Sequence, residues 1–269
     1  MYLDFYGLRE MPFSITPDPR FLFFTRNHRD AMDNLVYGIV ERKGFIQLVG
    51  EVGCGKTTLC RAALTALTDH IQTALILNPT ISETQLIKAI LADLGCPVKG
   101  NQRLALIGQL NDYLLHCAQR GINVAVIIDE AQDASPALME QIRLLSNLET
   151  DQHKLLQIVL AGQPELDRRL SEPGLRQLRQ RVMIRAVLQP LNREETEQYV
   201  VHRLGVAGGD DGAGFEPKSV DLVYRRSGGI PRLINKICDR AMLAGYASGE
   251  RRIPPATVER ALRELEGVL

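Results

Sequence analysis

The sequence contains no tryptophan, no long apolar run and no excess of either charge. Lysine plus arginine and aspartate plus glutamate both number 32, so the whole molecule has no strong field toward nucleic acid or anionic lipid. No stretch approaches the roughly 20 apolar residues that a membrane span requires. Residues 1–20 are interrupted by acidic residues and prolines, and so they lack the apolar core of a signal peptide. These absences predict a soluble protein that is cytoplasmic by default.

The cysteines are also uninformative for metal or disulfide chemistry. They are odd in number, scattered, and form no C-x-x-C pair, at Cys54, Cys60, Cys96, Cys117 and Cys238. This pattern indicates neither a zinc site nor a disulfide framework. We expect buried or half-buried thiols in a reducing compartment.

Short apolar runs alternate with longer helical patterns over the first two thirds of the chain. The runs that read as strands are 45–50, 73–78, 124–129, 155–162 and 182–189. The first four are almost continuously apolar, as expected for central parallel strands covered on both faces. Helical patterns lie between them at 56–67, 83–94, 104–120 and 136–148. The alternation predicts a three-layer α/β fold with a parallel five-stranded sheet and right-handed crossovers.

The character of the chain changes after Pro190, where helical patterns follow one another and no strand is expected. Asn192 is a good N-cap for the first of these helices. We therefore predict an α/β domain over residues 1–190 and a small all-helical domain over 191–269. Residues 1–26 form an arm rich in aromatics and prolines, which we expect to pack on the sheet edge or to wall an adenine pocket.

Residues 50–58 read GEVGCGKTT and fit the phosphate-loop pattern G-x-x-x-x-G-K-[ST] at every fixed position. A strand precedes the motif and a helix follows it, which is the context that the motif requires. Glycines let the backbone curl so that successive N–H groups point at phosphate oxygens, and the helix N-terminus adds partial positive charge. We expect ATP to be bound by Gly50, Glu51, Val52, Gly53, Cys54, Gly55, Lys56, Thr57 and Thr58.

Within this loop, Lys56 is expected to reach the β- and γ-phosphates, and the Thr57 hydroxyl to ligate Mg²⁺. Cys54 lies near a helix N-terminus, which lowers the pKa of a thiol. Cys54 is then either a small residue at a variable position or a thiol whose oxidation blocks nucleotide binding.

A second motif, VAVIIDEAQ, ends an apolar strand in two carboxylates. Asp129 is expected to complete the Mg²⁺ shell through water. Glu130 can polarise a water for attack on the γ-phosphorus, which is general-base work. Two acidic residues at a strand end are otherwise a common solvated turn, but beside a phosphate loop they indicate hydrolysis.

Together, the phosphate loop, IIDEAQ and the helical C-terminal domain resemble the AAA+ ATPases. More narrowly, MYLDFYGLREMPFSITPDPRFLF, GEVGCGKTTL, RLLSNLET, IVLAGQPEL and GGIPRLINKICDRAM are similar to the ExeA/GspA-type secretion ATPases, including relatives near pilus and exosortase loci. The resemblance runs from Met1 to about Ala247. Members of that family often continue into a transmembrane helix and a periplasmic part, so we expect a shorter relative or a fragment.

The resemblance also implies residues that report nucleotide state. Gln163 resembles the polar sensor that reads the γ-phosphate and orients water. Asn147 is a second polar residue in that neighbourhood, for which a helix C-cap is an equally good explanation. In GGIPR, Arg232 resembles the second sensor of AAA+ lids, and Gly228, Gly229 and Pro231 are explained by helix ends.

An arginine finger is implied by the stretch GLRQLRQRVMIRAVLQPL. Arg181 is our first choice, because it directly precedes the fifth strand, with Arg179 and Arg176 as alternates. A finger neutralises transition-state charge on a neighbour's nucleotide, and the alternative is a basic helix face that makes surface pairs. A trans-acting finger would make the active unit a homo-oligomer, as a ring or a filament.

The resemblance implies an ATPase that drives assembly or remodelling of a secretion or surface-polymer export apparatus at the inner membrane. Two other functions stay open. One is a DNA-associated AAA+ ATPase of the origin-recognition or transposition-helper type, favoured by the basic cluster RRLSEPGLRQLRQR and disfavoured by the zero net charge. The other is a slow nucleotide-dependent switch or scaffold.

Overall fold

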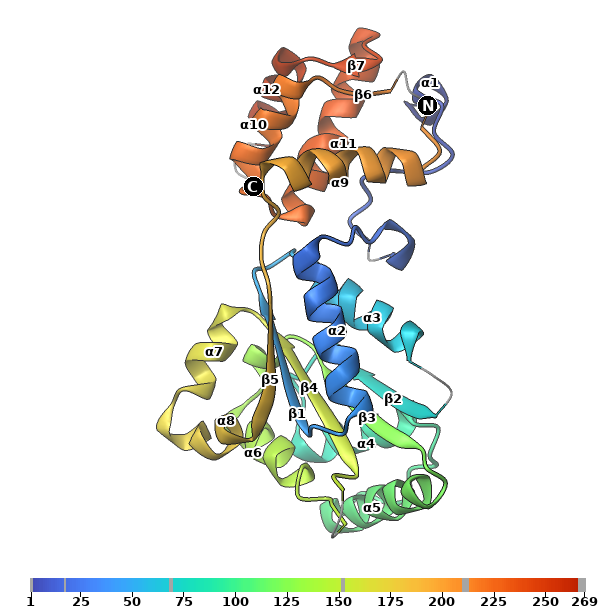
Figure 1. Ribbon diagram of the computed structural model, residues 1–269, viewed down its shortest axis with the longest axis vertical. Coiled ribbons are helices and arrows are strands. Elements are labelled where there is room, and N and C mark those ends of the chain that lie inside the picture. The colour runs from blue at the N-terminus through green and yellow to red at the C-terminus, as the bar shows by residue number, and fades with distance from the viewer. Residues whose placement is uncertain (1, 17, 68–69, 151–152, 210–212, 266–269) are drawn as a thin grey trace. The chain divides into compact units, whose positions relative to one another are not determined.

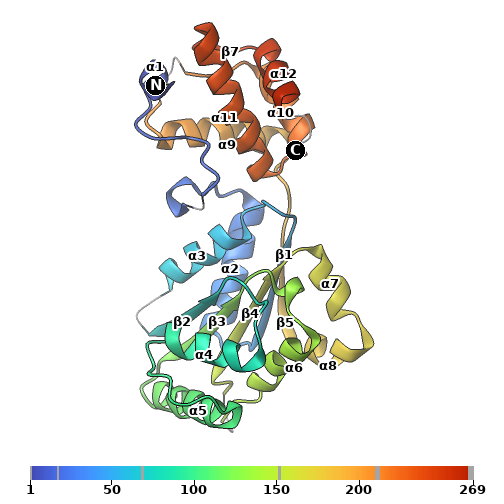
Figure 2. The ribbon, with the colours of Figure 1, turned by 180° about the vertical axis from the view of Figure 1, so that it is seen from behind.

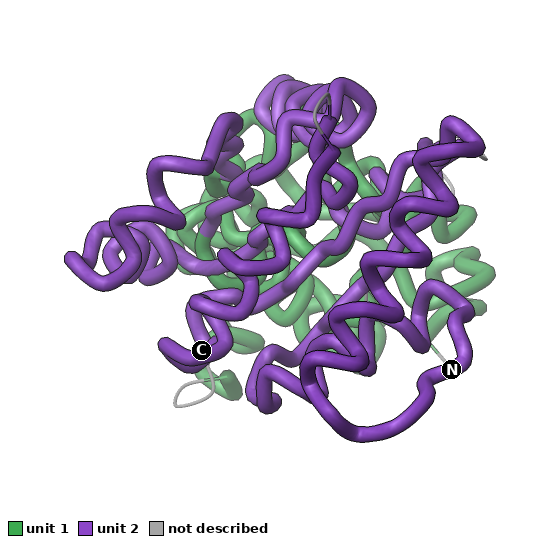
Figure 3. Tube along the Cα trace, turned by 90° about the horizontal axis from the view of Figure 1, so that it is seen from below, with its two compact units in different colours: residues 1–25, 51–58, 189–269 green, residues 26–50, 59–188 purple. Residues whose placement is uncertain are grey.

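The computed structural model describes residues 2–16, 18–67, 70–150, 153–209 and 213–265. The chain divides into two compact units, which Figure 3 shows in different colours. Unit 1 comprises Met1–Thr25, Glu51–Thr58 and Gln189–Leu269, and unit 2 comprises Arg26–Gly50 and Leu59–Leu188. Each unit therefore draws on segments that are far apart in the sequence.

Unit 2 is built on a five-stranded parallel sheet with the order β2-β3-β4-β1-β5. The strands are β1 (Phe45–Gly50), β2 (Ile71–Ile76), β3 (Asn123–Ile128), β4 (Leu156–Gly162) and β5 (Val182–Leu188). Every residue of β1, β3 and β4 is buried, as their continuous apolar runs predicted. Because the strands are parallel, their carboxyl ends lie along one edge of the sheet, with Gly162 of β4 paired to Val49 of β1. The predicted sheet is confirmed.

Helices cover both faces of this sheet. They are α2 (Arg26–Val40), α3 (Lys56–Ala66), α4 (Glu83–Asp93), α5 (Arg103–Gln119), α6 (Pro136–Leu145), α7 (Pro164–Leu170) and α8 (Arg176–Arg181). Figures 1 and 2, from opposite sides, show α2 on one face of the sheet and α4 and α6 on the other. At Gly38 of α2, an added Cβ would lie 2.6 Å from Ile46, so the absence of a side chain lets this helix approach β1 closely. The three-layer α/β fold is confirmed.

Unit 1 contains four helices after residue 189 among its described residues. They are α9 (Arg193–Val206), α10 (Pro217–Ser227), α11 (Pro231–Ser248) and α12 (Pro255–Glu264). Asn192 caps α9 in a capping box with Glu195, as its position in the sequence predicted. The expectation of no strand after Pro190 is wrong, because β6 (Gly214–Phe215) pairs in parallel with β7 (Arg252–Ile253). These strands are two residues long, too short to show a period in the sequence.

The N-terminal arm folds with this helical segment. It contains α1 (Tyr2–Tyr6) and a 3₁₀ turn at Pro19–Phe21. Tyr6 is fully buried, and its hydroxyl donates to the carbonyl oxygens of Met242 and Glu250, at 3.0 Å each. Tyr2, Tyr6, Leu8, Phe13 and Phe21 share one hydrophobic core with residues of α9–α12. The assignment of residues 1–26 to the α/β domain, and their expected packing on the sheet edge, are therefore corrected.

Strand β5, at one end of the strand order, contacts a helix of the same unit. Helix α2 packs along β5, and Asn27 Nδ2 donates to the carbonyl of Val187 over 2.8 Å. The aromatic side chains of the arm bury large apolar surfaces wherever a complementary core is open to them. The sequence did not show that this core lies among the helices of unit 1.

Candidate functional site

The phosphate loop joins the carboxyl end of β1 to the first turn of α3. Gly53 and Gly55 have φ values of 84° and 96°, which L-residues rarely adopt. Lys56 is 5% exposed, and its Nζ donates to the carbonyl oxygen of Glu51 over 3.1 Å. The Cys54 N–H donates to the same oxygen over 3.2 Å. The loop is thus curled tightly, with the lysine ammonium folded back over it, as a phosphate cradle requires.

Cys54 differs from the expectation of a reactive thiol. Its side chain is fully buried, and burial raises its pKa to about 11. Lys56 opposes this rise electrostatically, but desolvation is the larger effect. The interpretation of a small residue accommodated inside the loop agrees with the structure, and the lowered pKa is corrected.

The loop is in direct contact with the start of α11 inside unit 1. The Arg232 N–H donates to the carbonyl oxygen of Gly53 over 3.2 Å. An added Cβ at Gly53 would lie 2.6 Å from Cβ of Arg232. The Arg232 side chain is exposed. Arg232 is therefore held against the phosphate loop by its backbone, while its guanidinium remains accessible.

The rest of GGIPR shapes this contact. Gly228 ends α10 in the left-handed region with φ of 59°, and Pro231 occupies the first turn of α11. At Gly229, an added Cβ would overlap the carbonyl oxygen of Leu191. Both glycines thus have structural reasons to be glycine, as expected from their helix-end positions.

The acidic strand end lies in unit 2, directly after β3. Asp129 is 2% exposed, and its Oδ1 accepts the Glu130 N–H over 2.9 Å. Glu130 has φ of 49° and ψ of 38°, the left-handed helical region. Among the described residues, only Arg42 is another non-glycine residue with positive φ. Such backbone strain persists where surrounding contacts enforce it, and it concentrates at functional sites.

Two glutamines fix the Glu130 carboxylate. Its Oε2 accepts from Nε2 of Gln132 over 2.8 Å and from Nε2 of Gln163 over 3.1 Å. Gln163 follows β4 directly and precedes the first turn of α7. The structure therefore brings together Glu130 and Gln163, which are 33 residues apart in the chain.

Sequence reasoning missed Gln132, although it is the last letter of IIDEAQ. It lies in a short 3₁₀ turn at Ala131–Asp133 and is 8% exposed. The signal that could have found it is an amide side chain two positions after the acidic pair, at the end of a buried apolar strand.

Asn147 and Arg181 meet elsewhere in unit 2, at the end of α6. Arg181 Nη1 donates to Oδ1 of Asn147 over 2.7 Å, to the carbonyl of Arg143 over 3.3 Å, and to the Ser146 hydroxyl. These acceptors include a carbonyl of the last turn of α6, which also accepts from the Ser146 hydroxyl, so Arg181 caps α6. For Asn147, the structure matches the helix-end interpretation.

The two alternates for the arginine finger are placed differently. Arg176 and Arg179 lie on α8 and are both exposed, whereas Arg181 is half-buried. Arg179 is close enough to Asp167 to interact with it electrostatically.

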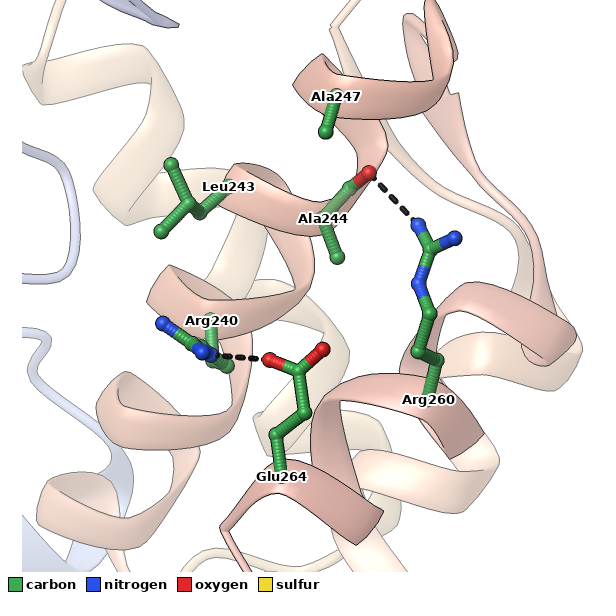
Figure 4. A pocket seen from close by; sticks show the side chains of 6 residues that line it. All are labelled: Arg240, Leu243, Ala244, Ala247, Arg260 and Glu264. Atoms are coloured by element: carbon green, nitrogen blue, oxygen red, sulfur yellow. Dashed lines mark hydrogen bonds and ion pairs between the residues drawn. The ribbon is translucent and has the colours of Figure 1, made fainter.

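A separate groove lies in unit 1 between α11 and α12 (Figure 4). It is lined by Arg240, Leu243, Ala244, Ala247, Arg260 and Glu264, none of which the sequence had singled out. Arg240 pairs with Glu264 at 2.6 Å, and Arg260 donates to the carbonyl of Ala244 over 2.7 Å. The polar groups of the groove are therefore directed mainly at one another.

In the described part of the chain, no three His, Cys, Asp or Glu side chains are grouped to hold a metal ion. A Mg²⁺ ion bound to a nucleotide needs few protein ligands, because phosphate oxygens and waters complete its shell. Within unit 2, the buried carboxylate of Asp129 has the oxygen chemistry that such an ion prefers. A search of the described helices finds none long and apolar enough to cross a membrane.

Comparisons with known proteins agree with this architecture. Residues 40–170 match a family described as an AAA domain. The chain is 45% identical over all 269 residues to general secretion pathway protein A of Aeromonas hydrophila, and it spans 49% of that protein's length.

Solved structures show the same fold at low identity. An Aeropyrum pernix ORC2 protein, in ADPNP–ADP complexes, is 19% identical with a TM-score of 0.70, over 95% of this chain and 71% of that one. The RuvB Holliday junction branch migration motor of Thermotoga maritima is 17% identical with a TM-score of 0.59, over 88% and 69% of the two chains.

The sheet order, the phosphate loop and the acidic strand end define a P-loop nucleoside triphosphatase fold of the AAA+ class. Within that class, the chain is similar over all of its 269 residues to general secretion pathway protein A, which bears out the resemblance to the ExeA/GspA-type secretion ATPases. The chain spans about half the length of that relative.

Proposed function

We propose that this chain binds ATP with Mg²⁺ and hydrolyses it, and that its nucleotide state controls association with further copies of itself. The observation that carries the proposal is the strained Glu130 backbone, whose carboxylate is held by two amide side chains at the carboxyl edge of the sheet. A solvated turn would not need such an arrangement, whereas a general base must be oriented.

The phosphate loop supplies the binding half of the reaction. Backbone N–H groups of residues 50–58 would hold the phosphates, and Lys56 would neutralise charge on the β- and γ-phosphates. Thr57 and Asp129 would hold Mg²⁺, which supplies charge neutralisation on the phosphate oxygens when it is bound. Glu130 would take a proton from the attacking water, and Gln163 would orient that water and report the γ-phosphate.

Arg232 is proposed to report nucleotide occupancy to the helical lid, residues 191–269. Its backbone is bonded to the phosphate loop, so a change in the loop is transmitted directly to the start of α11. Its exposed guanidinium is available for bidentate contact with phosphate oxygens.

Self-association is proposed because hydrolysis at one nucleotide site would require an arginine from a second copy of the chain. The finger is one of Arg176, Arg179 and Arg181. Exposure on α8 supports Arg179 or Arg176 over our first choice, because Arg181 already has three acceptors within its own chain. Head-to-tail contacts of this kind build rings or helical filaments.

The work of the cycle is proposed to be assembly or remodelling of a secretion or surface-polymer export apparatus. The support is similarity over all 269 residues of this chain to about half of general secretion pathway protein A. A cytoplasmic location at the inner membrane, reached through partner proteins, would suit that role.

A DNA-associated function is the second candidate. The exposed arginines of α7 and α8 are Arg168, which pairs with Glu165, and Arg176 and Arg179, and they would supply positive charge for phosphates. One similar structure is an ORC of Drosophila bound to DNA, at 22% identity and a TM-score of 0.64. The third candidate, a slow nucleotide-dependent switch, would need only binding and a change of shape.

The deciding experiment measures ATP turnover and particle size for wild type and Glu130→Gln, with and without a non-hydrolysable ATP analogue. We expect turnover and ATP-dependent assembly in wild type, and assembly with strongly reduced but measurable turnover in the variant, because the isosteric amide cannot accept the proton. Equal turnover in both proteins would refute the role of Glu130. DNA-stimulated turnover that declines with salt would favour the second candidate, and binding without turnover the third.

A further inference from the structure

Gln132 makes hydrogen bonds to both strand ends at the proposed hydrolytic site. Its Nε2 donates to Oε2 of Glu130 over 2.8 Å, and its Oε1 accepts the backbone N–H of Gln163 over 3.0 Å. Both ends of the amide are therefore used, one at the turn after β3 and the other at the end of β4. This pairing also assigns the amide orientation, because only nitrogen can donate to the carboxylate.

The surroundings hold this side chain in place. Gln132 is 8% exposed, and an added Cβ at Gly162 would lie 2.7 Å from its Oε1. Nη1 of Arg169 donates to the backbone carbonyl of Gln132. The Gln132 amide is therefore part of a packed network rather than a mobile surface group.

The two amides act on the same oxygen of Glu130. Gln132 and Gln163 both donate to Oε2, and Oε1 accepts no hydrogen bond from any described residue. A carboxylate anchored through one oxygen keeps the other in a defined direction with its lone pairs available. A neutral amide also anchors the carboxylate and leaves its negative charge in place. An arginine or lysine in the same position would cancel that charge.

We infer that Gln132 is a positioning residue for hydrolysis: it anchors Oε2 of Glu130 so that Oε1 faces the attacking water. This inference rests on the proposed function. In the step it serves, Oε1 takes one proton from water while the water oxygen bonds to the γ-phosphorus. The bond from the γ-phosphorus to the β–γ bridging oxygen breaks, and ADP leaves with the electron pair of that bond.

The test compares two variants of Gln132 in the full chain. Gln132→Glu keeps the shape and the acceptor for the Gln163 N–H but removes the donor to Glu130, and Gln132→Leu removes both. We expect kcat for ATP to fall on the order of 10- to 100-fold in each, since loss of alignment has effects of that size. KM and the affinity for a fluorescent ATP analogue should not change, because Gln132 does not lie in the phosphate loop.

A matched control is available in Gln141 of α6, which is 1% exposed and has no partner for either amide atom among the described residues. Gln141→Leu makes the same chemical change in a buried position outside the site. We expect its kcat to equal that of wild type. An equal loss in both leucine variants would indicate a general effect of polar removal and would overturn the inference.

A double-mutant cycle with Glu130→Gln separates the inference from the proposed function. If Gln132 acts through Glu130, adding Gln132→Leu to Glu130→Gln lowers turnover no further. Wild-type kcat in both Gln132 variants, or fully multiplicative losses in the cycle, would overturn the inference while leaving hydrolysis established. If wild type does not hydrolyse ATP, the proposed function fails and the inference fails with it.

Discussion

The backbone N–H of Arg232 donates to the carbonyl oxygen of Gly53 over 3.2 Å, so the first turn of α11 is bonded directly to the phosphate loop. The contact is close because Gly53 has no side chain: an added Cβ would lie 2.6 Å from Cβ of Arg232. Positive φ at Gly53 adds a second requirement for glycine at the same position. One residue thus serves both the curl of the loop and its contact with the helical lid.

Gly53→Ala should therefore weaken nucleotide binding and lower thermal stability together. Left-handed backbone costs an L-residue about 1–2 kcal/mol, and the overlap with Arg232 adds a comparable amount. The measurements are thermal unfolding and binding of a fluorescent nucleotide. Gly174→Ala is the control, because an added Cβ there meets no atom within 4 Å. Equal behaviour of the two alanine variants would show that the close contact is unimportant.

The capping role of Arg181 leads to a prediction that separates structure from catalysis. Arg181→Ala should destabilise the fold by about 1.5 kcal/mol, because acceptors at the end of α6 lose a charged donor. Arg179→Ala should leave stability unchanged, because its side chain is exposed. Chemical denaturation of the two variants and of wild type tests this difference.

Mixing experiments then identify the trans-acting arginine. The Arg179→Ala protein retains Glu130, and the Glu130→Gln protein retains Arg179. If Arg179 is the finger, the two inactive proteins should regain ATP turnover when mixed, because some interfaces combine both intact residues. Recovery with Arg176→Ala in place of Arg179→Ala would assign the finger to Arg176. No recovery in any mixture would contradict a trans-acting finger on α8.

Cys54 should resist alkylation until the solution is strongly alkaline. Burial raises the pKa of its thiol to about 11, above the ordinary value near 9, so the thiolate is rare at neutral pH. Iodoacetamide labelling followed by mass spectrometry should modify the half-buried Cys96 before Cys54 at about pH 8. Because the folded pKa is the higher one, this thiol stabilises the fold below about pH 9, and the contribution is lost as pH rises toward 11. Faster labelling of Cys54 than of Cys96 would contradict its burial.

Arg203 should control the attachment of the N-terminal arm. Its guanidinium donates to the carbonyls of Pro12 and Ser14, at 2.5 and 3.0 Å, and lies 4.4 Å from the ring centre of Phe21. Arg203→Met keeps an apolar stem but removes both donors, so we expect a loss of about 3 kcal/mol and faster proteolysis of residues 1–25. Limited proteolysis with N-terminal sequencing measures this effect.

Arg226→Met provides the comparison for that variant, because Arg226 lies exposed in the last turn of α10. Cleavage within the arm at the same rate in both variants would mean that Arg203 does not hold it.

The groups that define the class of this protein could be predicted from sequence. Strand limits at Phe45–Gly50 agreed with the structure, because a continuous apolar run between a turn and a glycine-rich loop has one favourable state. The N-cap at Asn192 was predicted for the same reason, since a cap acts on backbone N–H groups only a few residues away, and the structure adds a capping box with Glu195. Interactions between residues that are close together in the sequence can be predicted from the sequence.

Interactions between distant residues could not be predicted. The arm was expected at the sheet edge or in the wall of an adenine pocket, and only the tertiary structure shows Tyr6 bonded to Met242, 236 residues along the chain. Arg181 looked like a finger because it precedes a strand, yet it caps a helix that ends 36 residues earlier, at Leu145. The partner of a side chain depends on how the whole chain packs. The hydrophobic effect is non-directional, so it does not by itself specify which apolar surface an aromatic residue contacts.

The sequence by itself determined the phosphate loop, the acidic strand end and the five strands of the parallel sheet, because each depends on local spacing and periodicity. Only the tertiary structure decided that Gln132 and Gln163 hold one oxygen of Glu130 and that Arg232 is bonded to Gly53. Those contacts join strand ends and helix starts that lie far apart in the sequence and meet only in the folded structure. The sequence identified most of these residues, but the orientation of their side chains depends on the packing of the fold.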